Sequence, residues 1–347
     1  MDVKLKDVAD MSGVSVSTVS LVLNGKGNIS RSVRARVIAT AQELGYLKNI
    51  HASSMASQRS SHIAVLVNES YEKAFEWFLV RNIIMPIEAT ITQQNYYPIL
   101  IPVTLNHSTW EIVKKVQMSG AGGVFAIHFG SRELFVQLED RGIPVVLLNH
   151  SPYAQEFHSV TADALYGSFQ ATKHLLDKGH RHLVYADYTR PDVPGIVFDR
   201  GAGFQKAISE YQGGIDATEL TAHSVDSNEH VHEVAKRILE EKGAAPIAVV
   251  AHDDYFAAKL YAYWSHEGFK VPDDISLIAP GDTLDYALPF IPPISTMQID
   301  TKLMGTLAGE MMLRRLAGES DSVEALKVQH AFRERGSCDR KSEVGHV

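Results

Sequence analysis

The chain has 347 residues, of which 45% are hydrophobic and 8% aromatic, and its formal net charge is −8. A chain of this length exceeds the usual size of one domain, and its apolar content suffices for sizeable buried cores. It has no run long and apolar enough to span a membrane, no secretion signal after Met1, and only one cysteine, Cys338, which excludes an internal disulfide. We therefore expect a multidomain cytoplasmic protein.

The first fifty residues predict three short helices, the second of which starts just after a tight turn. Gly13 supplies the backbone freedom that such a turn requires. Ser15 and Ser30 stand where a serine oxygen can cap the second and third helices. So small a domain is stable only if the three apolar faces meet in one core, which leaves one face of the second helix free. This pattern is typical of a helix-turn-helix, whose second helix enters the major groove of DNA.

Three short helices would also fit a helical bundle without a ligand, but the charge distribution favours DNA binding. Residues 1–61 carry eight Lys and Arg against four Asp and Glu, a net charge of +4. The remaining residues carry 25 against 37, a net charge of −12. A basic segment on an acidic body suits a domain that binds phosphates while the body avoids DNA.

From His62 onward, short apolar runs alternate with helical stretches. We predict buried strands at IAVLV, YPILI, GGVFAI, PVVLLN, HLVYA, PIAVVA and ISLIA. The predicted helices are Phe78–Gln94, Ser131–Arg141, Ala164–Lys178, Arg200–Glu210, Glu229–Glu241, Asp254–Glu267 and Thr301–Ala317. The alternation predicts parallel sheets covered by helices on both faces. So many elements exceed one comfortable sheet, so we expect two α/β lobes, with Pro292-Pro293 marking a crossing between them.

Many segments resemble the lactose/galactose-repressor (LacI/GalR) family of transcriptional regulators. LKDVADMSGVSVSTVSLVLNG, NIS and RVIATAQELGY are similar to the DNA-binding head of that family. Its effector-binding core is matched in order by HLLDKGHRHLVYA, RGAGFQKAI, AVVAHDD, VPDDISLIAPGD, PPISTMQID and RERGS. The resemblance implies a small all-α helix-turn-helix head followed by an α/β two-lobed, periplasmic-binding-protein-like core.

The resemblance and the composition together predict four parts. These are a helix-turn-helix head at residues 1–47, a hinge segment at 48–61, the core at 62–337 and a polar tail at 338–347. Within the core we assign residues 62–161 and 294–322 to the first lobe and residues 162–293 and 323–337 to the second. We expect a homodimer on double-stranded operator DNA, because one head reads one half-site of a near-palindromic site.

The second helix places Val16, Ser17 and Leu21 at the three main base-reading positions of the resembled family. Most members carry arginine where this chain has Leu21, and arginine is the commonest specific reader of guanine. We expect an operator that departs from the usual half-site at that base; the alternative is a head with poor specificity. Ser20 lies on the same free face. The expected phosphate and sugar contacts are Thr18, Asn24, Ser30, Arg31, Arg34, Tyr46 and Asn49.

The hinge segment is polar and rich in small residues, which by composition alone indicates a flexible linker. In the resembled family this stretch becomes a helix on operator DNA, and a leucine from each subunit enters the minor groove. Met55 stands at the position of that leucine, and Ala52 matches a small residue of the family. We expect Met55 to act as the wedge, since an unbranched apolar side chain can still unstack a base step.

The resemblance also implies an effector site between the lobes. Arg200 in RGAGF matches an arginine that binds ligand hydroxyls or a carboxylate, and Asp282 in APGD matches an aspartate that accepts from sugar hydroxyls. Asp163 matches a second acidic position, and His252 precedes Asp253 where the family has Asn-Asp. Two acceptors and a guanidinium suit a polyhydroxylated neutral ligand or a sugar-like acid. Taken singly, Asp253 could instead cap the next helix, and Arg200 could pair with a surface carboxylate.

Asn149 and His128 end two predicted strands of the first lobe and are candidate ligand contacts there. We expect neither a metal nor a cofactor, since clustered cysteines and an HExxH pattern are both absent from the sequence. A sugar-acting enzyme could use the same cleft, but no GxGxxG, P-loop or GxSxG motif follows a strand. A sugar-transport binding protein would need no basic head. The sequence therefore predicts a DNA-binding regulator that responds to a sugar or nucleoside-like effector. The resemblance to the family implies that it is a repressor.

Overall fold

The computed structural model describes residues 3–23, 27, 29–44, 46, 60–68, 74–104, 106–128, 130–149, 152–189, 199–242, 246–319 and 322–338. The chain divides into two compact units, the head (Met1–Ser60) and the core (Ser61–Val347). Among the residues described, no helix has both the length and the apolar character needed to cross a membrane.

The described residues of the head form three helices, α1 (Leu5–Ser12), α2 (Val16–Leu23) and α3 (Arg31–Glu43). Gly13 ends α1 in the left-handed region, with φ of 66°, so the chain can turn directly into α2. Both predicted caps form: Ser15 Oγ accepts from the Thr18 N–H at 3.1 Å and Ser30 Oγ from the Val33 N–H at 3.4 Å. The three helices share one buried cluster of small side chains, Val8, Ala9, Val19, Val22, Val37 and Ala41.

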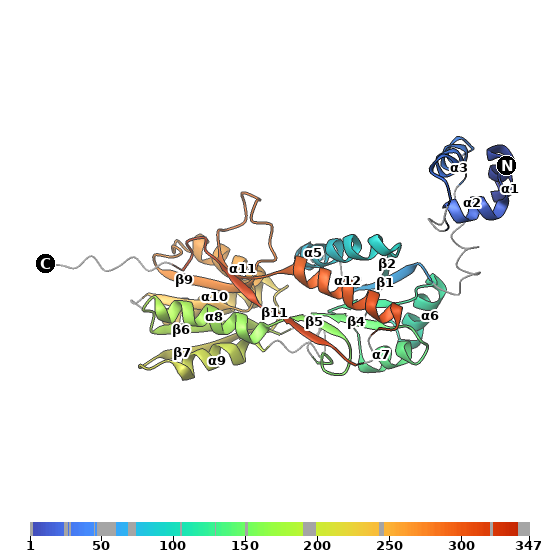
Figure 1. The fold of residues 1–347 in the computed structure, drawn as a ribbon. Helices are drawn as coiled ribbons and strands as arrows, with labels where there is room; N and C mark the ends of the chain where they lie inside the picture. Colours follow the sequence, from blue (N-terminus) through green and yellow to red (C-terminus); the bar gives the residue numbers. More distant parts are fainter. Residues whose placement is uncertain are drawn as a thin grey trace. The chain divides into compact units, whose positions relative to one another are not determined.

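The core consists of two lobes, each built on a six-stranded sheet, which confirms the predicted fold class (Figure 1). The first-lobe sheet has the order β11-β5-β4-β3-β1-β2 and is parallel throughout. Its strands are β1 (His62–Asn68), β2 (Tyr97–Val103), β3 (Val124–Ile127), β4 (Val145–Leu148), β5 (Ser159–Ala162) and β11 (Ala325–Val328). Strand residues alternate between a cluster shared with α5 (Ala74–Ile91) and α12 (Thr301–Ala317) and one shared with α6 (Thr109–Ser119) and α7 (Arg132–Glu139).

The second-lobe sheet has the order β12-β10-β9-β8-β6-β7, and only β12 runs antiparallel to its neighbour. Its strands are β6 (His182–Tyr188), β7 (Asp216–Ala222), β8 (Ile247–Ala251), β9 (Ile275–Gly281), β10 (Ser295–Ile299) and β12 (His330–Arg333). One face packs on α8 (Ala164–Asp177) and α9 (Arg200–Glu210), the other on α10 (Asn228–Lys242) and α11 (Asp254–His266). Both sheets are therefore covered on both faces, as their continuous apolar runs predict.

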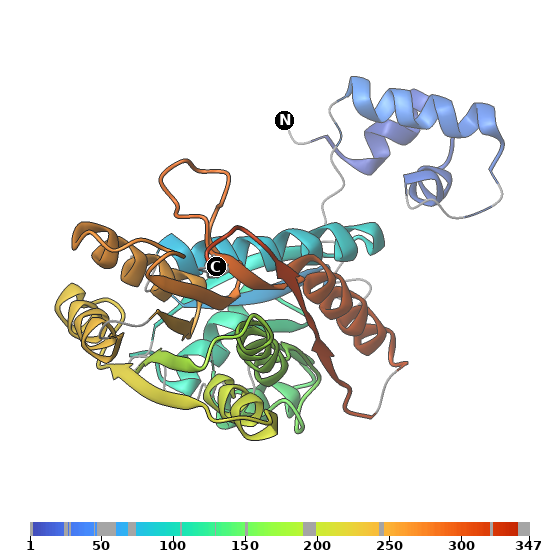
Figure 2. The same ribbon diagram turned by 90° about the vertical axis from the view of Figure 1, so that its left-hand side faces the viewer.

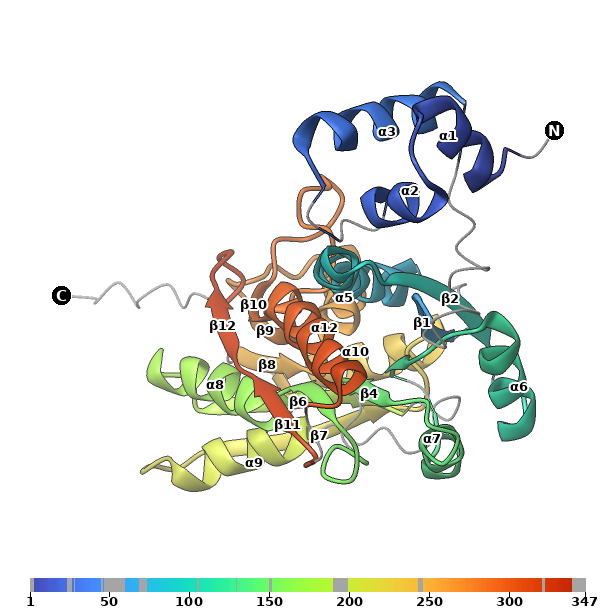
Figure 3. The ribbon, with the colours of Figure 1, turned by 45° about the vertical axis from the view of Figure 1, so that its right-hand side comes forward.

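Three single-residue connections join the lobes. Asp163 separates β5 from α8, Asp300 separates β10 from α12, and Gln329 separates β11 from β12. Figure 3 shows β11 continuing directly into β12. The three connections begin at the carboxyl ends of β5, β10 and β11, which run parallel to β4, β9 and β5 respectively. Each connection is only one residue long and leads into the other lobe. The carboxyl edges of the two sheets must therefore face each other.

These connections correct the predicted lobe boundaries. We assigned residues 294–322 to the first lobe and 323–337 to the second, but β10 pairs with β9 in the second-lobe sheet and β11 with β5 in the first. Pro292-Pro293 does not mark a crossing, because the segment between β9 and β10 projects from the second lobe and returns to it (Figure 2). An apolar run identifies a strand locally, whereas the sheet that it joins depends on residues far away in the chain.

Candidate functional site

Helix α2 exposes the residues expected to read DNA bases. The side chains of Val16 and Leu21 are 44% and 39% exposed, and Ser17 is exposed as well. Val19 and Val22 on the opposite side are buried in the head. The helix thus presents hydroxyl and apolar groups, and no charged side chain, to a partner. The half-buried members of the predicted contact set on α2 are Thr18 and Ser20.

Most of the expected phosphate contacts that the structure describes lie on α3 or next to its ends. Ser30 and Arg31 are exposed at the start of α3. Arg34 donates from Nη1 to the Val22 carbonyl at 3.4 Å, so it also stabilises the end of α2. Tyr46 packs against the buried cluster of the head. Four predicted contacts lie outside the described residues, namely Asn24, Asn49, Ala52 and Met55.

The predicted effector residues gather at the two facing sheet edges. Five of them directly follow a strand: His128, Asn149 and Asp163 in the first-lobe sheet, and His252 and Asp282 in the second-lobe sheet. Asp253 comes directly after His252. Arg200 is the first residue of α9. Four non-glycine residues described by the structure have a positive φ, and three of the four belong to this set: His128 (53°), Asn149 (51°) and Asp282 (66°). Such backbone strain concentrates at functional sites.

His128 and Asn149 form a pair at the first-lobe edge. Asn149 Nδ2 lies 3.0 Å from His128 Nε2, and Asn149 Oδ1 accepts from the Ala162 N–H at 3.3 Å. The amide is thereby held in one orientation. Asp163 serves as the cap of α8 by accepting from the Tyr166 N–H at 3.2 Å.

Arg200 and His252 belong to a buried network in the second lobe. Arg200 is 6% exposed and donates from Nη1 to the His252 carbonyl. His252 Nδ1 lies 2.7 Å from Asp187 Oδ1 and 3.5 Å from the Tyr185 hydroxyl. Burial opposes ionisation of Asp187, but the hydrogen bond and charge of His252, with help from the Tyr188 N–H and Arg200, outweigh it and lower the pKa of Asp187. Arg200 is thus held inside the lobe by a hydrogen bond to the backbone of His252.

Asp187 is a candidate that the sequence analysis missed. It is the last residue but one of β6, and its side chain is 33% exposed at the same sheet edge as His252. The signal was available, because a polar side chain near the end of a buried strand is the criterion that selected Asn149 and His128. The strand was taken to end at Ala186, so Asp187 fell outside it.

Asp253 and Asp282 are both bound within the lobe. Asp253 caps α11 through the Phe256 N–H at 2.8 Å and accepts from the Tyr188 hydroxyl at 2.5 Å. Asp282 accepts from three donors, the Thr296 hydroxyl, the Gln298 amide and the Arg335 guanidinium, at 2.7, 2.7 and 2.6 Å. A carboxylate has about four lone-pair sites, so Asp282 keeps about one for a ligand.

Asp254, next to the cap of α11, is fully buried and holds the segment that follows β9. Its carboxylate accepts from the Thr283 N–H and hydroxyl, both at 2.7 Å, from the Leu284 N–H at 2.9 Å and from the Tyr286 hydroxyl at 3.2 Å. Burial and the neighbouring Asp253 raise the pKa of Asp254 to about 6 despite these donors. The carboxylate fixes the backbone beside Asp282.

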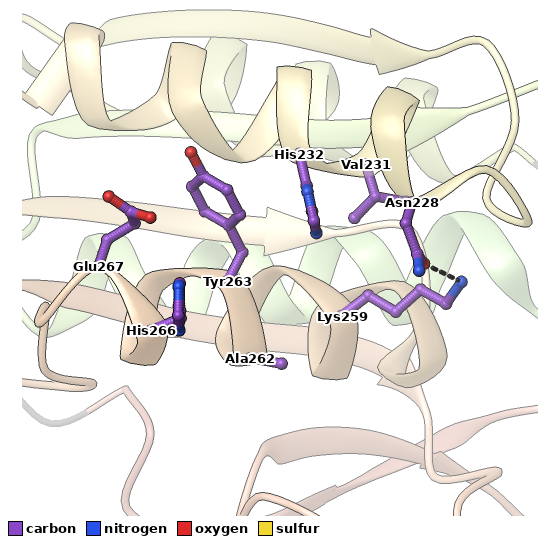
Figure 4. Close-up of a pocket in the computed structure, with 8 residues that line it drawn as sticks. All are labelled: Asn228, Val231, His232, Lys259, Ala262, Tyr263, His266 and Glu267. Carbon is purple, nitrogen blue, oxygen red and sulfur yellow. Dashed lines mark hydrogen bonds between the residues drawn. The ribbon is translucent and has the colours of Figure 1, made fainter.

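A surface depression of 470 Å³ lies elsewhere on the second lobe, between α10 and α11 (Figure 4). Within it, Lys259 Nζ lies 3.4 Å from Asn228 Oδ1 and donates to the Val225 carbonyl at 2.8 Å. None of the predicted effector residues lines this depression, so it is separate from the candidate site. Its lining residues are Asn228, Val231, His232, Lys259, Ala262, Tyr263, His266 and Glu267.

Two family descriptions match the chain. Residues 4–49 match the bacterial regulatory proteins of the lacI family, and residues 172–338 match the periplasmic binding protein-like domain. The head is therefore a lacI-family DNA-binding domain. The protein is accordingly a DNA-binding transcriptional regulator whose core is of the kind that binds a small-molecule effector.

The chain is 27% identical over 316 residues to the HTH-type transcriptional regulator DegA of Bacillus subtilis, a match that covers 88% of this chain and 89% of DegA. It is 25% identical to the HTH-type transcriptional repressor PurR of Vibrio parahaemolyticus, covering 94% of this chain and 95% of PurR. The fold is similar to that of the Lac repressor dimer bound to operator and the anti-inducer ONPF. That likeness has a TM-score of 0.76 and 22% identity, and it covers 98% of this chain and 100% of the other.

Proposed function

We propose that this regulator represses transcription by binding a near-palindromic operator as a homodimer, and that a small polyhydroxylated effector controls its affinity for DNA. The exposed face of α2, on a basic head with its own buried cluster, is the observation that carries the proposal. A helix presented in this way fits the major groove, while the serines and arginine at the start of α3 are placed to contact phosphates.

Apolar exposure on the first lobe supports the homodimer. Strand β2 is at the edge of its sheet, and its Tyr97 and Leu100 side chains are 45% and 44% exposed. Met85 on α5, which contacts β2, is 61% exposed. Exposed large apolar side chains along a sheet edge and the adjoining helix are candidates for an interface. The similar Lac repressor structure is a dimer on its operator.

The facing sheet edges support an effector, a sugar or a nucleoside, between the lobes. Arg200 and Asp187 offer a donor and an acceptor on the second-lobe side, and the Asn149–His128 pair offers an amide and an imidazole on the first. A ligand that touches both edges favours one spacing of the lobes over another. Such differential binding is what links an effector to DNA affinity. The similar CelR structure (TM-score 0.65, 22% identity, 96% of this chain and 99% of that one) holds cellobiose.

The relatives are regulators, and we accordingly infer that the core binds its ligand without converting it. Because its partner is chromosomal DNA, we place the protein in the cytoplasm.

Operator selection from random duplex DNA by the purified full chain tests the proposal. The selection is repeated with D-ribose, cellobiose, D-glucuronate and guanosine, one at a time. We expect one enriched near-palindromic site whose occupancy falls when one compound is present. Salt-sensitive binding without an enriched site would overturn sequence-specific repression, and an enriched site that ignores every compound would overturn effector control.

A further inference from the structure

His330 stands at the third connection between the lobes and has no role in the site described so far. It is the first residue of β12, directly after Gln329, and it pairs in register with Ile299 at the end of β10. Its side chain is buried, with 8% exposed. The residue therefore lies inside the protein, at the edge of the second-lobe sheet that faces the first lobe.

Gly167 on α8 makes room for this imidazole. A Cβ atom placed on Gly167 would lie 2.9 Å from Cγ, Cδ2 and Cε1 of His330 alike. Equal distances to three ring atoms mean that the flat face of the ring lies on the glycine. Because real Cβ atoms are essentially never that close to a neighbour, any other residue at position 167 would displace the ring. The glycine and the histidine thus form a fitted pair.

Neither ring nitrogen of His330 has a hydrogen-bond partner among the described residues, although both are buried. A neutral imidazole carries one donor and one acceptor, and leaving both unpaired inside a protein is unfavourable. Buried polar groups are nearly always paired. A binding site is the common exception, because its groups are paired by the ligand and the free protein is less stable in return.

The surroundings of His330 indicate which ligand groups it can pair. Burial first, and the positive charge of Arg200 second, lower the pKa of His330 to about 3, so the ring is neutral at physiological pH. A neutral ring cannot act as a second cation for a carboxylate or a phosphate. It can accept from one hydroxyl and donate to another oxygen. These are the pairings of a neutral polyol.

We propose that His330 is an effector-contacting residue that selects ligands by their hydroxyl groups, and that packing against Gly167 holds its ring in position for this contact. The inference rests on the proposed effector function and adds a residue and a ligand class to it. His330 begins β12, and only Gln329 separates it from β11, so a ligand bound to its ring also acts on the connection between the lobes. Binding of a ligand to His330 can therefore change the spacing of the two lobes directly.

The test compares His330→Leu with His158→Leu in the full chain. Leucine has a similar volume to histidine and no polar atom. His158 is also buried, with 1% exposed, but its Nδ1 lies 3.4 Å from the Glu324 N–H. It directly precedes β5, at the end of the strand away from the connection at Asp163. We expect His330→Leu to raise the melting temperature of the free protein, since an unpaired group is removed, and His158→Leu to lower it.

Ligand binding is then measured by thermal shift and calorimetry with D-ribose, cellobiose, guanosine and D-glucuronate on all three proteins. For a compound that stabilises the wild type, we expect an affinity about tenfold weaker or more in His330→Leu, an unchanged affinity in His158→Leu, and partial recovery in His330→Gln, which keeps a donor and an acceptor. We also expect neutral sugars or guanosine to outperform glucuronate.

Three results would overturn the inference. Equal affinity of the wild type and His330→Leu would remove His330 from the site and leave the proposed function intact. A fall in melting temperature in His330→Leu, as in the control, would show that the imidazole is a structural group paired by ordered water. If no compound stabilises the wild type, effector control fails and this inference fails with it, while operator selection still reports separately on DNA binding.

Discussion

The head and the core present their functional side chains in opposite ways. On α2 the candidate contacts Val16, Ser17 and Leu21 are exposed on one side of a helix whose other side is packed. At the sheet edges of the core, Arg200 and Asp282 are bound to neighbouring groups of the same lobe. DNA is a large partner that meets a surface. A small ligand must be surrounded, so the groups that contact it have to be fixed by bonds within the protein.

This difference separates the expected effects of substitutions. A change on the exposed face of α2 alters the choice of DNA sequence and leaves the fold intact. A change in the second-lobe network alters ligand binding and stability together, because each polar group there has a neighbour that depends on it. The following predictions test that separation, beginning with the largest effect.

Substituting Val19 by Asp should abolish DNA binding while the core stays folded. Val19 is fully buried, and an unpaired carboxylate in its place costs several kcal/mol, roughly the whole stability of so small a unit. Mobility-shift assays should show no complex, whereas the thermal unfolding of the core is unchanged. The matched control is Val16→Asp on the exposed face, which should leave the head folded by circular dichroism. A head that unfolds in both variants would contradict the two-sided description of α2.

Local features of the head and of most core elements could be predicted from the sequence. The caps Ser15 and Ser30 depend on residues three positions away, and the helix Arg200–Glu210 was predicted with its observed bounds. Strands β7, β10, β11 and β12 were not predicted, and α6 was also missed. Strand β7, for example, is an edge strand with alternating polar residues. Each missed element has a weaker apolar signal than the buried strands that were found.

The site was only partly predictable for a different reason. Strand ends can be found from the sequence, and they located Asn149 and His128 at the first-lobe edge, whereas Asp282 came from the resemblance to the family. The function of His330 depends on Gly167 and on Arg200, which lie more than a hundred residues earlier in the chain. No local pattern distinguishes such a histidine from one that is paired. The lobe membership of β10 and β11 was wrong for the same reason.

Asp254 should make the stability of the core fall as the pH rises. Its folded pKa of about 6 exceeds the ordinary value of 3.8, so the folded state binds this proton more tightly than the unfolded state. The contribution is complete below about pH 4 and is lost as the pH rises through about 6. A shift of this size corresponds to about 3 kcal/mol.

Urea unfolding between pH 4 and 7.5 measures this effect as the difference between the wild type and Asp254→Asn, which cannot titrate there. The exposed Asp140, substituted by Asn, controls for the change in net charge. Parallel pH profiles for the wild type and Asp254→Asn would show that the donors of Thr283 and Leu284 outweigh burial, and that Asp254 is held as a carboxylate.

Substituting Leu21 by Arg should change which DNA sequence is selected without changing the fold. Leu21 is 39% exposed, so a longer side chain finds room, and a guanidinium can pair with guanine for about 1–3 kcal/mol of discrimination. Operator selection should show a new guanine preference at one symmetric position of each half-site. Leu21→Met keeps an apolar contact and should retain the wild-type site. If Leu21→Arg selects the wild-type site too, position 21 does not read bases.

Substituting Ser15 by Ala should have the smallest effect. It tests a residue that affects both the stability of the head and its recognition of DNA. Ser15 caps α2, and the loss of its hydrogen bond to the Thr18 N–H costs about 1 kcal/mol of head stability. Ser15 Oγ also lies 2.8 Å from both Ser17 Oγ and Thr18 Oγ1, so it orients two hydroxyls of the DNA-facing helix. Ser17→Ala, which keeps the cap, is the control for head stability.

Fluorescence anisotropy measures the affinities of the wild type and Ser15→Ala for operator DNA and for non-specific DNA. The ratio of the two affinities distinguishes between two roles of Ser15. An equal loss for both kinds of DNA means that Ser15 acts only by keeping the head folded. A larger loss for the operator means that the hydroxyls fixed by Ser15 contribute to sequence reading, since phosphate contacts alone carry no sequence information. We expect the second result, because a helix with no charged side chain on its exposed face has few other polar groups with which to read a base edge.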